Sequence, residues 1–174
     1  MLFRSARGAI SATPAIIPGL GTGAELATAI ADQMLRTVLE AHMILGIAHL
    51  RGLDMQAVEL RRLDILLVLG LACGAAEIEG DVVRVDDLEI SIAHLQSGEI
   101  PPEAALSLGT AVGVDIVSRI ARRRTAGILL RLLPGGASVA AAAWYDWRAA
   151  GSVGKHAIAY YDAVHSARNA SQPA

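Results

Sequence analysis

Apolar residues recur at intervals of three and four along most of the chain, which is the spacing of one face of an α-helix. The first such stretch runs from about Ala24 to Leu50, and Gly52 is placed to end it. Apart from a narrow stripe of charges, this stretch is apolar around most of its circumference. A helix of that kind is either central or covered by partners, so we expect a long central first helix. The stripe consists of Glu25, Asp32, Arg36 and Glu40.

The same periodicity predicts further helices along the rest of the chain. Asp54 is placed as an N-cap for the second helix. Asp64 should point largely away from the apolar side of that helix. Pro102 suits the first turn of the fourth. Val82-Val83 allows a brief extended piece, although a helix is favoured there. The expected helices are Met55 to Gly74, Val82 to Gln96, Glu103 to Leu133, Ser138 to Ala149 and Ser152 to Ala167.

A turn is expected at Pro134-Gly135-Gly136, because proline lacks an amide hydrogen and glycine is conformationally permissive. The helix after it is rich in alanine, and Gly154 follows further along. Small residues let another backbone approach closely, so these positions predict tight helix packing.

Composition supports a helical fold. Apolar residues make up 53% of the 174 residues but aromatic residues only 3%, which favours close helix packing over a β-sandwich. We therefore predict an all-α fold, a single compact domain of about five or six packed helices. Residues 1–13 form a flexible arm, residues 14–168 the domain and residues 169–174 a frayed C-terminus. A single cysteine, Cys73, excludes an internal disulfide and fits a reducing cytosol.

Small and aromatic residues follow a similar order in a known family. In the C-terminal half they are Pro134-Gly135-Gly136, a small-residue run, Tyr145-Asp146, Gly154, Ala157 and Tyr160. In the N-terminal half they are Pro18-Gly19-Leu20-Gly21, Asp32, Ile47-Ala48 and Gly52. This order resembles that of the EcsC-like and DUF697-like bacterial helical proteins. One departure is Trp144-Tyr145-Asp146-Trp147, where those families have an Asn-rich position. The resemblance implies an all-helical, membrane-associated or partner-docking module, and it carries over no catalytic residues.

Arginines form the strongest charge feature of the chain: Arg119, Arg122, Arg123, Arg124 and Arg131. One interpretation is a solvated segment that pairs with the acidic stretch Glu77 to Glu89. The other is a site for an anionic surface, most plausibly phospholipid. Nucleic acid is disfavoured, because the net charge is −2 and no aromatic residues interleave with the arginines.

Aromatic residues gather at Trp144, Tyr145 and Trp147, which hold both tryptophans of the chain. Trp144 and Trp147 are three apart and share a helix face. Core packing and an interfacial membrane anchor are both consistent with this pattern.

The spacing of the candidate catalytic and cofactor-binding residues does not match known motifs. The glycines of Gly19 to Gly23 match neither a dinucleotide fingerprint nor a P-loop. His42 and His49 share a helix face, but a third ligand at metal spacing is missing. We therefore assign no catalytic residue, no metal site and no cofactor. No run of 18 uncharged, mainly apolar residues is present, so no simple spanning helix is expected.

These patterns favour a non-enzymatic helical module that associates with an anionic membrane surface or docks a partner protein. Its expected location is the cytoplasm, peripheral at the inner face of the membrane. One alternative is a small-ligand-binding protein or enzyme with an apolar cavity between helices. Another is a self-assembling structural protein, a homo-oligomer.

Overall fold

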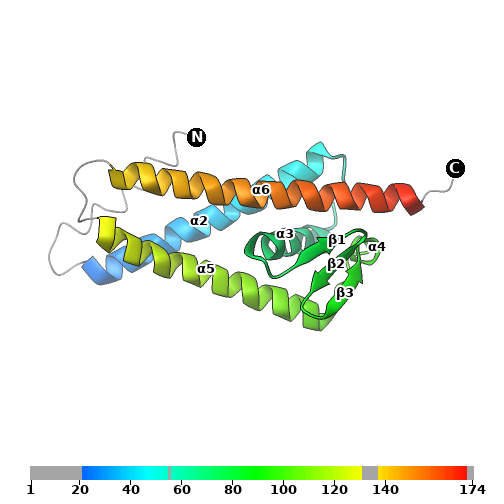
Figure 1. Ribbon diagram of the computed structural model, residues 1–174, viewed down its shortest axis with the longest axis horizontal. Coiled ribbons are helices and arrows are strands. Elements are labelled where there is room, and N and C mark those ends of the chain that lie inside the picture. Colours follow the sequence, from blue (N-terminus) through cyan, green and yellow to red (C-terminus); the bar gives the residue numbers. More distant parts are fainter. Residues whose placement is uncertain (1–20, 55, 131–136, 172–174) are drawn as a thin grey trace. The chain divides into compact units, whose positions relative to one another are not determined.

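The computed structural model describes residues 21–54, 56–130 and 137–171 (Figure 1). The chain is mostly helical, at 75%, with five helices in the described part. The helices are α2 (Gly21–Leu50), α3 (Val58–Cys73), α4 (Ile92–Leu95), α5 (Pro102–Leu130) and α6 (Ala137–Ser171). Helical periodicity therefore predicted the dominant structure correctly.

The all-α expectation is wrong in one segment, where a small antiparallel sheet stands. Its strands, in the order β1-β2-β3, are β1 (Glu77–Glu79), β2 (Val82–Val85) and β3 (Leu88–Ser91). The helix expected from Val82 to Gln96 is reduced to the short α4, which Ser91 caps by accepting a hydrogen bond from the His94 amide.

Two tight turns explain why the sheet forms. Glu79 pairs with Val82 and Val85 with Leu88, so each connection has two residues. The first residue of each turn, Gly80 or Asp86, has a positive φ, as such hairpins require. Along β2 the burial alternates with a period of two, which helical spacing does not produce.

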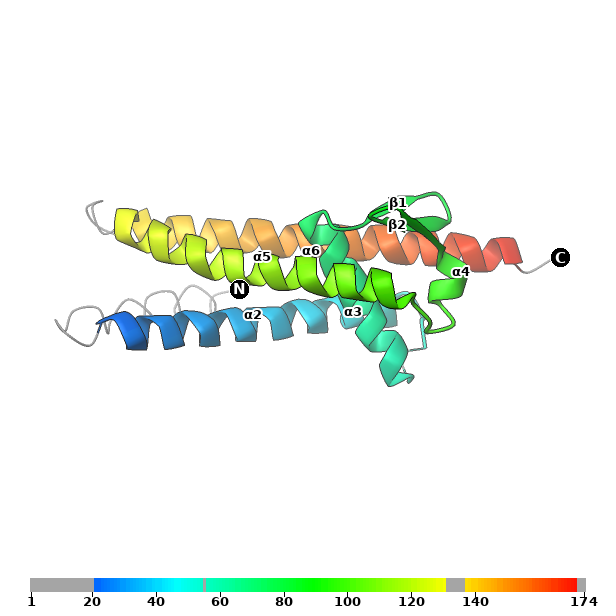
Figure 2. The ribbon, with the colours of Figure 1, turned by 90° about the horizontal axis from the view of Figure 1, so that it is seen from below.

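The C-terminal region also differs from expectation. Two helices were predicted there, but α6 is one helix of 35 residues that continues through Gly151 (Figure 2). Glycine inside a helix costs only ~1 kcal/mol relative to alanine, which a long helix tolerates. The turn at Pro134-Gly135-Gly136 lies outside the described residues.

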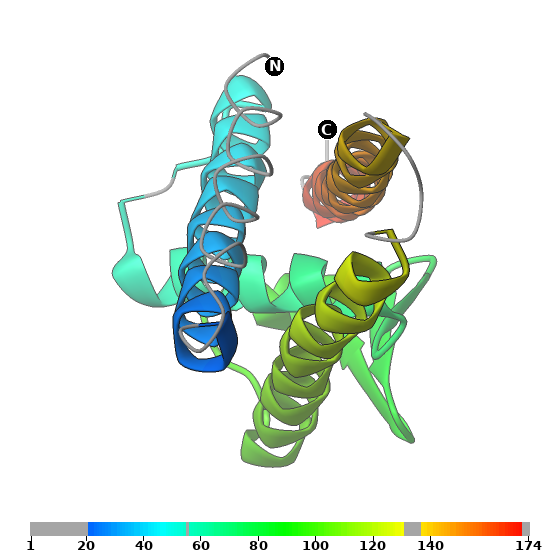
Figure 3. The same cartoon turned by 90° about the vertical axis from the view of Figure 1, so that its left-hand side faces the viewer.

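The two helices at the N-terminal end of the described chain have close to the expected bounds. Figure 3 shows α2 as one continuous helix, coloured from blue to cyan. It ends at Leu50, and Gly52 follows it with a φ of 70°. Asp54 does not cap α3, because the N-cap is Ala57 and the Asp54 carboxylate accepts from the Gln56 amide instead.

The chain divides into two compact units, each described here by itself. We call Met1–Leu39 with Ile116–Ala150 the arginine unit, and Glu40–Asp115 with Gly151–Ala174 the core unit. Every described buried hydrophobic residue belongs to the core unit. The expected division into arm, domain and frayed end stays a prediction.

Within the core unit α3 is covered most completely, and the expectation of a central first helix stays a prediction. Buried residues occupy consecutive positions of α3 from Leu67 to Leu71, so this helix is covered around most of its circumference. Gly70 lies so close to α5 that an added Cβ would be 2.5 Å from Leu108 Cδ2. By contrast, apolar side chains of α2 are exposed at Met34 and Val38.

Candidate functional site

A buried carboxyl group lies at the centre of the core unit. Asp64 of α3 is only 1% exposed, although its sequence position predicts an outward side chain. The Tyr160 hydroxyl donates to Asp64 Oδ1 at 3.0 Å, and the Tyr161 hydroxyl lies 3.4 Å from Oδ2. Gln96 Nε2 donates to the Tyr160 oxygen at 3.3 Å, and Arg168 Nη2 donates to Gln96 Oε1 at 3.1 Å. This network ties α6 to α3 and to the end of α4.

Burial sets the protonation of this network. It raises the pKa of Asp64 to about 6, while the tyrosine hydrogen bonds and the charge of Arg168 act in the opposite direction. Burial is the main cause that raises the pKa of both tyrosine hydroxyls, and the charge of Asp64 is the second. The hydroxyls therefore stay protonated and donate. Perturbed carboxyls of this kind occur at active sites and in structural networks. Here every named partner is a side chain of the fold, which indicates a structural role.

Further contacts attach the end of α2 to α6 in the same unit. Arg51 forms an ion pair with Asp162, and its carbonyl oxygen lies 2.8 Å from His165 Nε2. Gly154 lies beside Met43, and a Cβ added there would be 3.8 Å from the Met43 sulfur, an ordinary contact. Gly154 therefore faces a neighbouring helix, as expected of a packing position.

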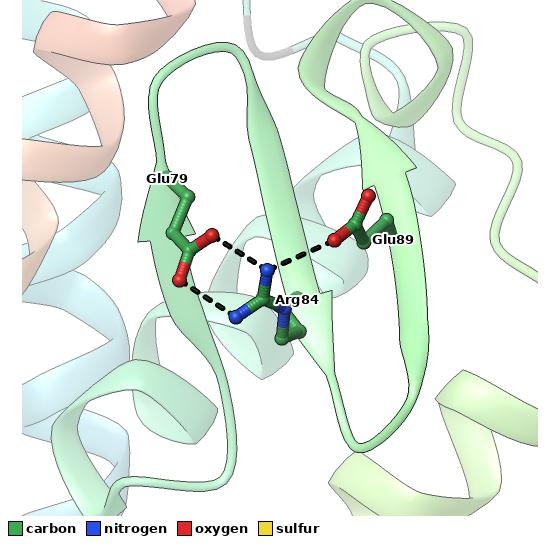
Figure 4. A network of polar contacts seen from close by, with 3 residues as sticks. All are labelled: Glu79, Arg84 and Glu89. Atoms are coloured by element: carbon green, nitrogen blue, oxygen red, sulfur yellow. Dashed lines mark hydrogen bonds and ion pairs between the residues drawn. The ribbon is translucent and has the colours of Figure 1, made fainter.

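The acidic stretch Glu77 to Glu89 supplies part of its own charge pairing. Arg84 of β2 donates to both oxygens of Glu79, at 2.7 and 2.6 Å, and to Glu89 at 2.9 Å (Figure 4). The three residues sit on neighbouring strands and are solvent-accessible, so the network adds little stability.

The arginine unit has the opposite arrangement of polar and apolar side chains. Its described buried residues are both polar, Gln33 at 1% and Arg36 at 8% exposed. Met34, one position away from Gln33 on α2, is 67% exposed, and Val117 of α5 is 65% exposed. The described part of this unit therefore buries polar groups and presents apolar ones. Its exposed large apolar side chains are Leu26, Ile30, Met34, Val38, Leu39, Val117, Trp144 and Trp147.

Gln33 sharpens this contrast. In the part of the chain that is described, neither polar atom of its buried amide has a hydrogen-bond partner. A buried polar group without a partner costs ~1–3 kcal/mol. Water-soluble helices avoid that combination, because polar residues normally point outward.

The predicted aromatic anchor is exposed where it is described. Trp144 is 53% and Trp147 63% exposed on α6, so core packing does not account for them. Arg148, which the sequence reasoning missed, places its guanidinium carbon 5.7 Å from the centroid of the Trp144 ring, one helical turn away. The side chain of Tyr145 lies outside the described ones.

The predicted arginine cluster lies at the C-terminal end of α5. Arg119 is half-buried there. Arg122, Arg123 and Arg124 belong to the same helix, although their side chains lie outside the described ones, as does the whole of Arg131. That these arginine side chains gather on one surface therefore stays a prediction.

Charge is divided unequally between the two units. The arginine unit contains nine arginines and three acidic residues, a formal net charge of +6. The core unit contains six basic and fourteen acidic residues, a net of −8. The chain total of −2 conceals this division. Basic charge therefore gathers in the unit whose described buried residues are polar.

The described residues contain neither a membrane span nor a metal-binding cluster. None of the described helices is long and apolar enough to cross a membrane. Within the same residues, no three His, Cys, Asp or Glu side chains are grouped so that they could hold a metal ion.

Together these features define a mostly helical protein with a small antiparallel sheet, in which one unit holds every described buried hydrophobic residue and the described buried residues of the other are polar. Comparison of the chain with models of protein families, with curated proteins and with solved structures found no match. The resemblance to the EcsC-like and DUF697-like proteins stays a prediction.

Proposed function

We propose that the protein is a non-enzymatic helical module that associates peripherally with a membrane surface through its arginine unit. The observation that carries this proposal is the inverted burial of that unit, with Gln33 and Arg36 inside and Met34, Val117 and Trp147 outside. Apolar side chains gain ~1.5–3 kcal/mol each when they leave water completely, so a surface of this kind favours an apolar environment.

A lipid surface accounts for more of these features than a protein partner does. Exposed tryptophans are typical of membrane interfaces, where one end of the ring is apolar and the other is hydrated. Basic residues of the same unit suit the negative surface of a cytoplasmic leaflet. The family resemblance proposed from the sequence points in the same direction. Docking of a partner protein is the alternative outcome of the test below.

The test is flotation of the purified protein with liposomes, compared between two sets of variants. Met34→Gln, Val38→Gln and Val117→Gln together remove apolar surface from the arginine unit. We expect at least about tenfold weaker vesicle binding for each side chain that enters the lipid, because ~1.4 kcal/mol corresponds to a factor of ten. Thermal unfolding of the core unit should stay unchanged, since these positions are solvent-exposed.

The matched control is Leu50→Gln with Leu106→Gln, which removes apolar side chains of the core unit that are even more exposed, at 85% and 72%. These changes should leave flotation intact. If both sets reduce flotation equally, binding is non-specific and the assignment to the arginine unit fails. If wild-type protein does not float with any vesicle, the membrane proposal is overturned and a protein partner takes its place.

A further inference from the structure

We propose that the arginine unit selects an anionic phospholipid leaflet, and that Arg148, held against the Trp144 ring, binds lipid phosphate oxygens there. This inference rests on the proposed membrane association. It adds the chemical class of the lipid, a residue that binds the lipid and the unit that contacts the lipid. Two observations support it independently: the division of charge between the units and the geometry of α6.

The division of charge indicates which unit contacts the lipid. An anionic leaflet attracts the arginine unit, at +6, and repels the core unit, at −8. A chain whose total charge is −2 would show little preference for such a surface if its charges were mixed evenly. The segregation therefore assigns the contact with the lipid to the arginine unit and not to the core unit.

The geometry of α6 identifies the contact. The guanidinium of Arg148 lies 5.7 Å from the Trp144 ring centroid, and both side chains are exposed. A cation–π contact limits the rotamers of the arginine but leaves its five N–H groups available as hydrogen-bond donors. An arginine guanidinium can donate two parallel hydrogen bonds to a phosphate group.

Trp147 explains why this phosphate should belong to a lipid. It is exposed one turn from Trp144 and directly precedes Arg148, so both indoles lie within about one turn of that arginine on the helix. A phospholipid interface offers phosphate oxygens beside an apolar layer, and this pairing matches a guanidinium beside indoles. An acidic peptide or a nucleic acid offers the charge without a continuous apolar layer for Met34 and Val117.

Tryptophan emission provides the experiment, because Trp144 and Trp147 are the only two tryptophans of the chain. The protein is titrated with vesicles of pure phosphatidylcholine and with vesicles that also contain phosphatidylglycerol. We expect a blue shift and binding that is much tighter for the anionic vesicles and is weakened by salt. The variants are Arg148→Gln, Arg148→Lys and, as a charge-matched control on the core unit, Arg62→Gln, another exposed arginine.

Arg148→Gln should weaken binding to anionic vesicles about fivefold, the usual effect of one basic residue near such a surface. Arg148→Lys should lie between it and wild type, because lysine keeps the charge but loses the planar fork. Arg62→Gln should not weaken binding. If Arg148→Gln behaves like Arg62→Gln, the role of Arg148 is overturned.

Equal binding to both kinds of vesicle would overturn the lipid selectivity and leave the proposed membrane association standing. Absence of binding to either kind would overturn both. A blue shift that is lost in Arg148→Gln while flotation persists would show that Arg148 seats the indoles without binding phosphate, which also contradicts the inference.

Discussion

At the scale of single residues, the core unit depends on one buried carboxyl group. Asp64 accepts from Tyr160 and Tyr161, which lie nearly a hundred positions away and join α6 to α3. The hydrogen bonds satisfy the carboxyl oxygens, yet burial still raises the pKa of Asp64 to about 6, from 3.8. The folded protein therefore holds this proton more tightly than the unfolded chain does.

This shift predicts a pH dependence of stability. Below pH 3.8 the Asp64 carboxyl is protonated in both the folded and the unfolded chain. Between pH 3.8 and about 6 the folded state holds the proton more tightly, so stability from Asp64 is present at low pH and lost as the pH rises through 6. The shift of about two units corresponds to ~3 kcal/mol in the free energy of unfolding.

The measurement is urea unfolding of wild type and Asp64→Asn at several pH values. Since other groups also titrate in this range, the difference between the two proteins isolates Asp64. We expect wild type to gain ~2–2.5 kcal/mol relative to Asp64→Asn on going from pH 7 to pH 4, most of the full effect. Two parallel stability profiles would show that Asp64 titrates normally.

Sequence reasoning could not find this network, for a physical reason. Because Asp64 is close to Arg61 and Arg62 in a helical pattern, the sequence predicts that it lies on a solvated helix face. Its burial depends on tyrosines supplied by a distant helix, which local periodicity does not report. For Trp144 and Trp147 the sequence left core packing and an interfacial anchor open. Both side chains are exposed, and their role as an anchor stays a proposal.

At the scale of elements, helix contacts in the core unit depend on particular glycines. A Cβ at Gly70 would lie 2.5 Å from Leu108 Cδ2, whereas a Cβ at Gly109 of α5 would meet nothing within 4 Å. The two glycines are both helical and differ in their surroundings. They therefore form a matched pair for the same substitution.

Gly70→Ala should lower the free energy of unfolding by ~1–3 kcal/mol, because Leu108 is fully buried and must move in a packed core. Gly109→Ala should raise it by ~0.5–1 kcal/mol, because alanine reduces the freedom of the unfolded chain. Thermal unfolding of the two variants measures both changes. Equal effects of the same sign would mean that α3 and α5 are not in contact at Gly70.

The sequence predicts the long helices better than it predicts the short strands. Long periodic helices such as α2 and α5 were predicted closely, because many residues contribute to the pattern. The strands were missed because each has three or four residues, too few for a period of two to stand out against a helical background. Their turn signals, Gly80-Asp81 and Asp86-Asp87, were the available evidence for hairpins.

At the scale of the whole molecule, the two units have complementary compositions. The core unit contains every described buried hydrophobic residue and carries a net charge of −8. The arginine unit, at +6, buries polar residues in its described part and exposes apolar ones. The amino-acid composition of the entire chain averages these differences away, so only the assignment of residues to units reveals them.

Hydrogen–deuterium exchange, with and without anionic vesicles, tests the membrane role of the arginine unit most directly. Exchange protection reports local stability, and helices without an apolar core open easily. We expect α3 and the α6 segment from Val153 to Val164 to be protected in both conditions. The α2 segment from Gly23 to Leu39 and the α6 segment from Trp144 to Ala150 should exchange fast in solution and become protected on vesicles. If those two segments are as protected as α3 without lipid, or if vesicles leave their exchange unchanged, the account is contradicted.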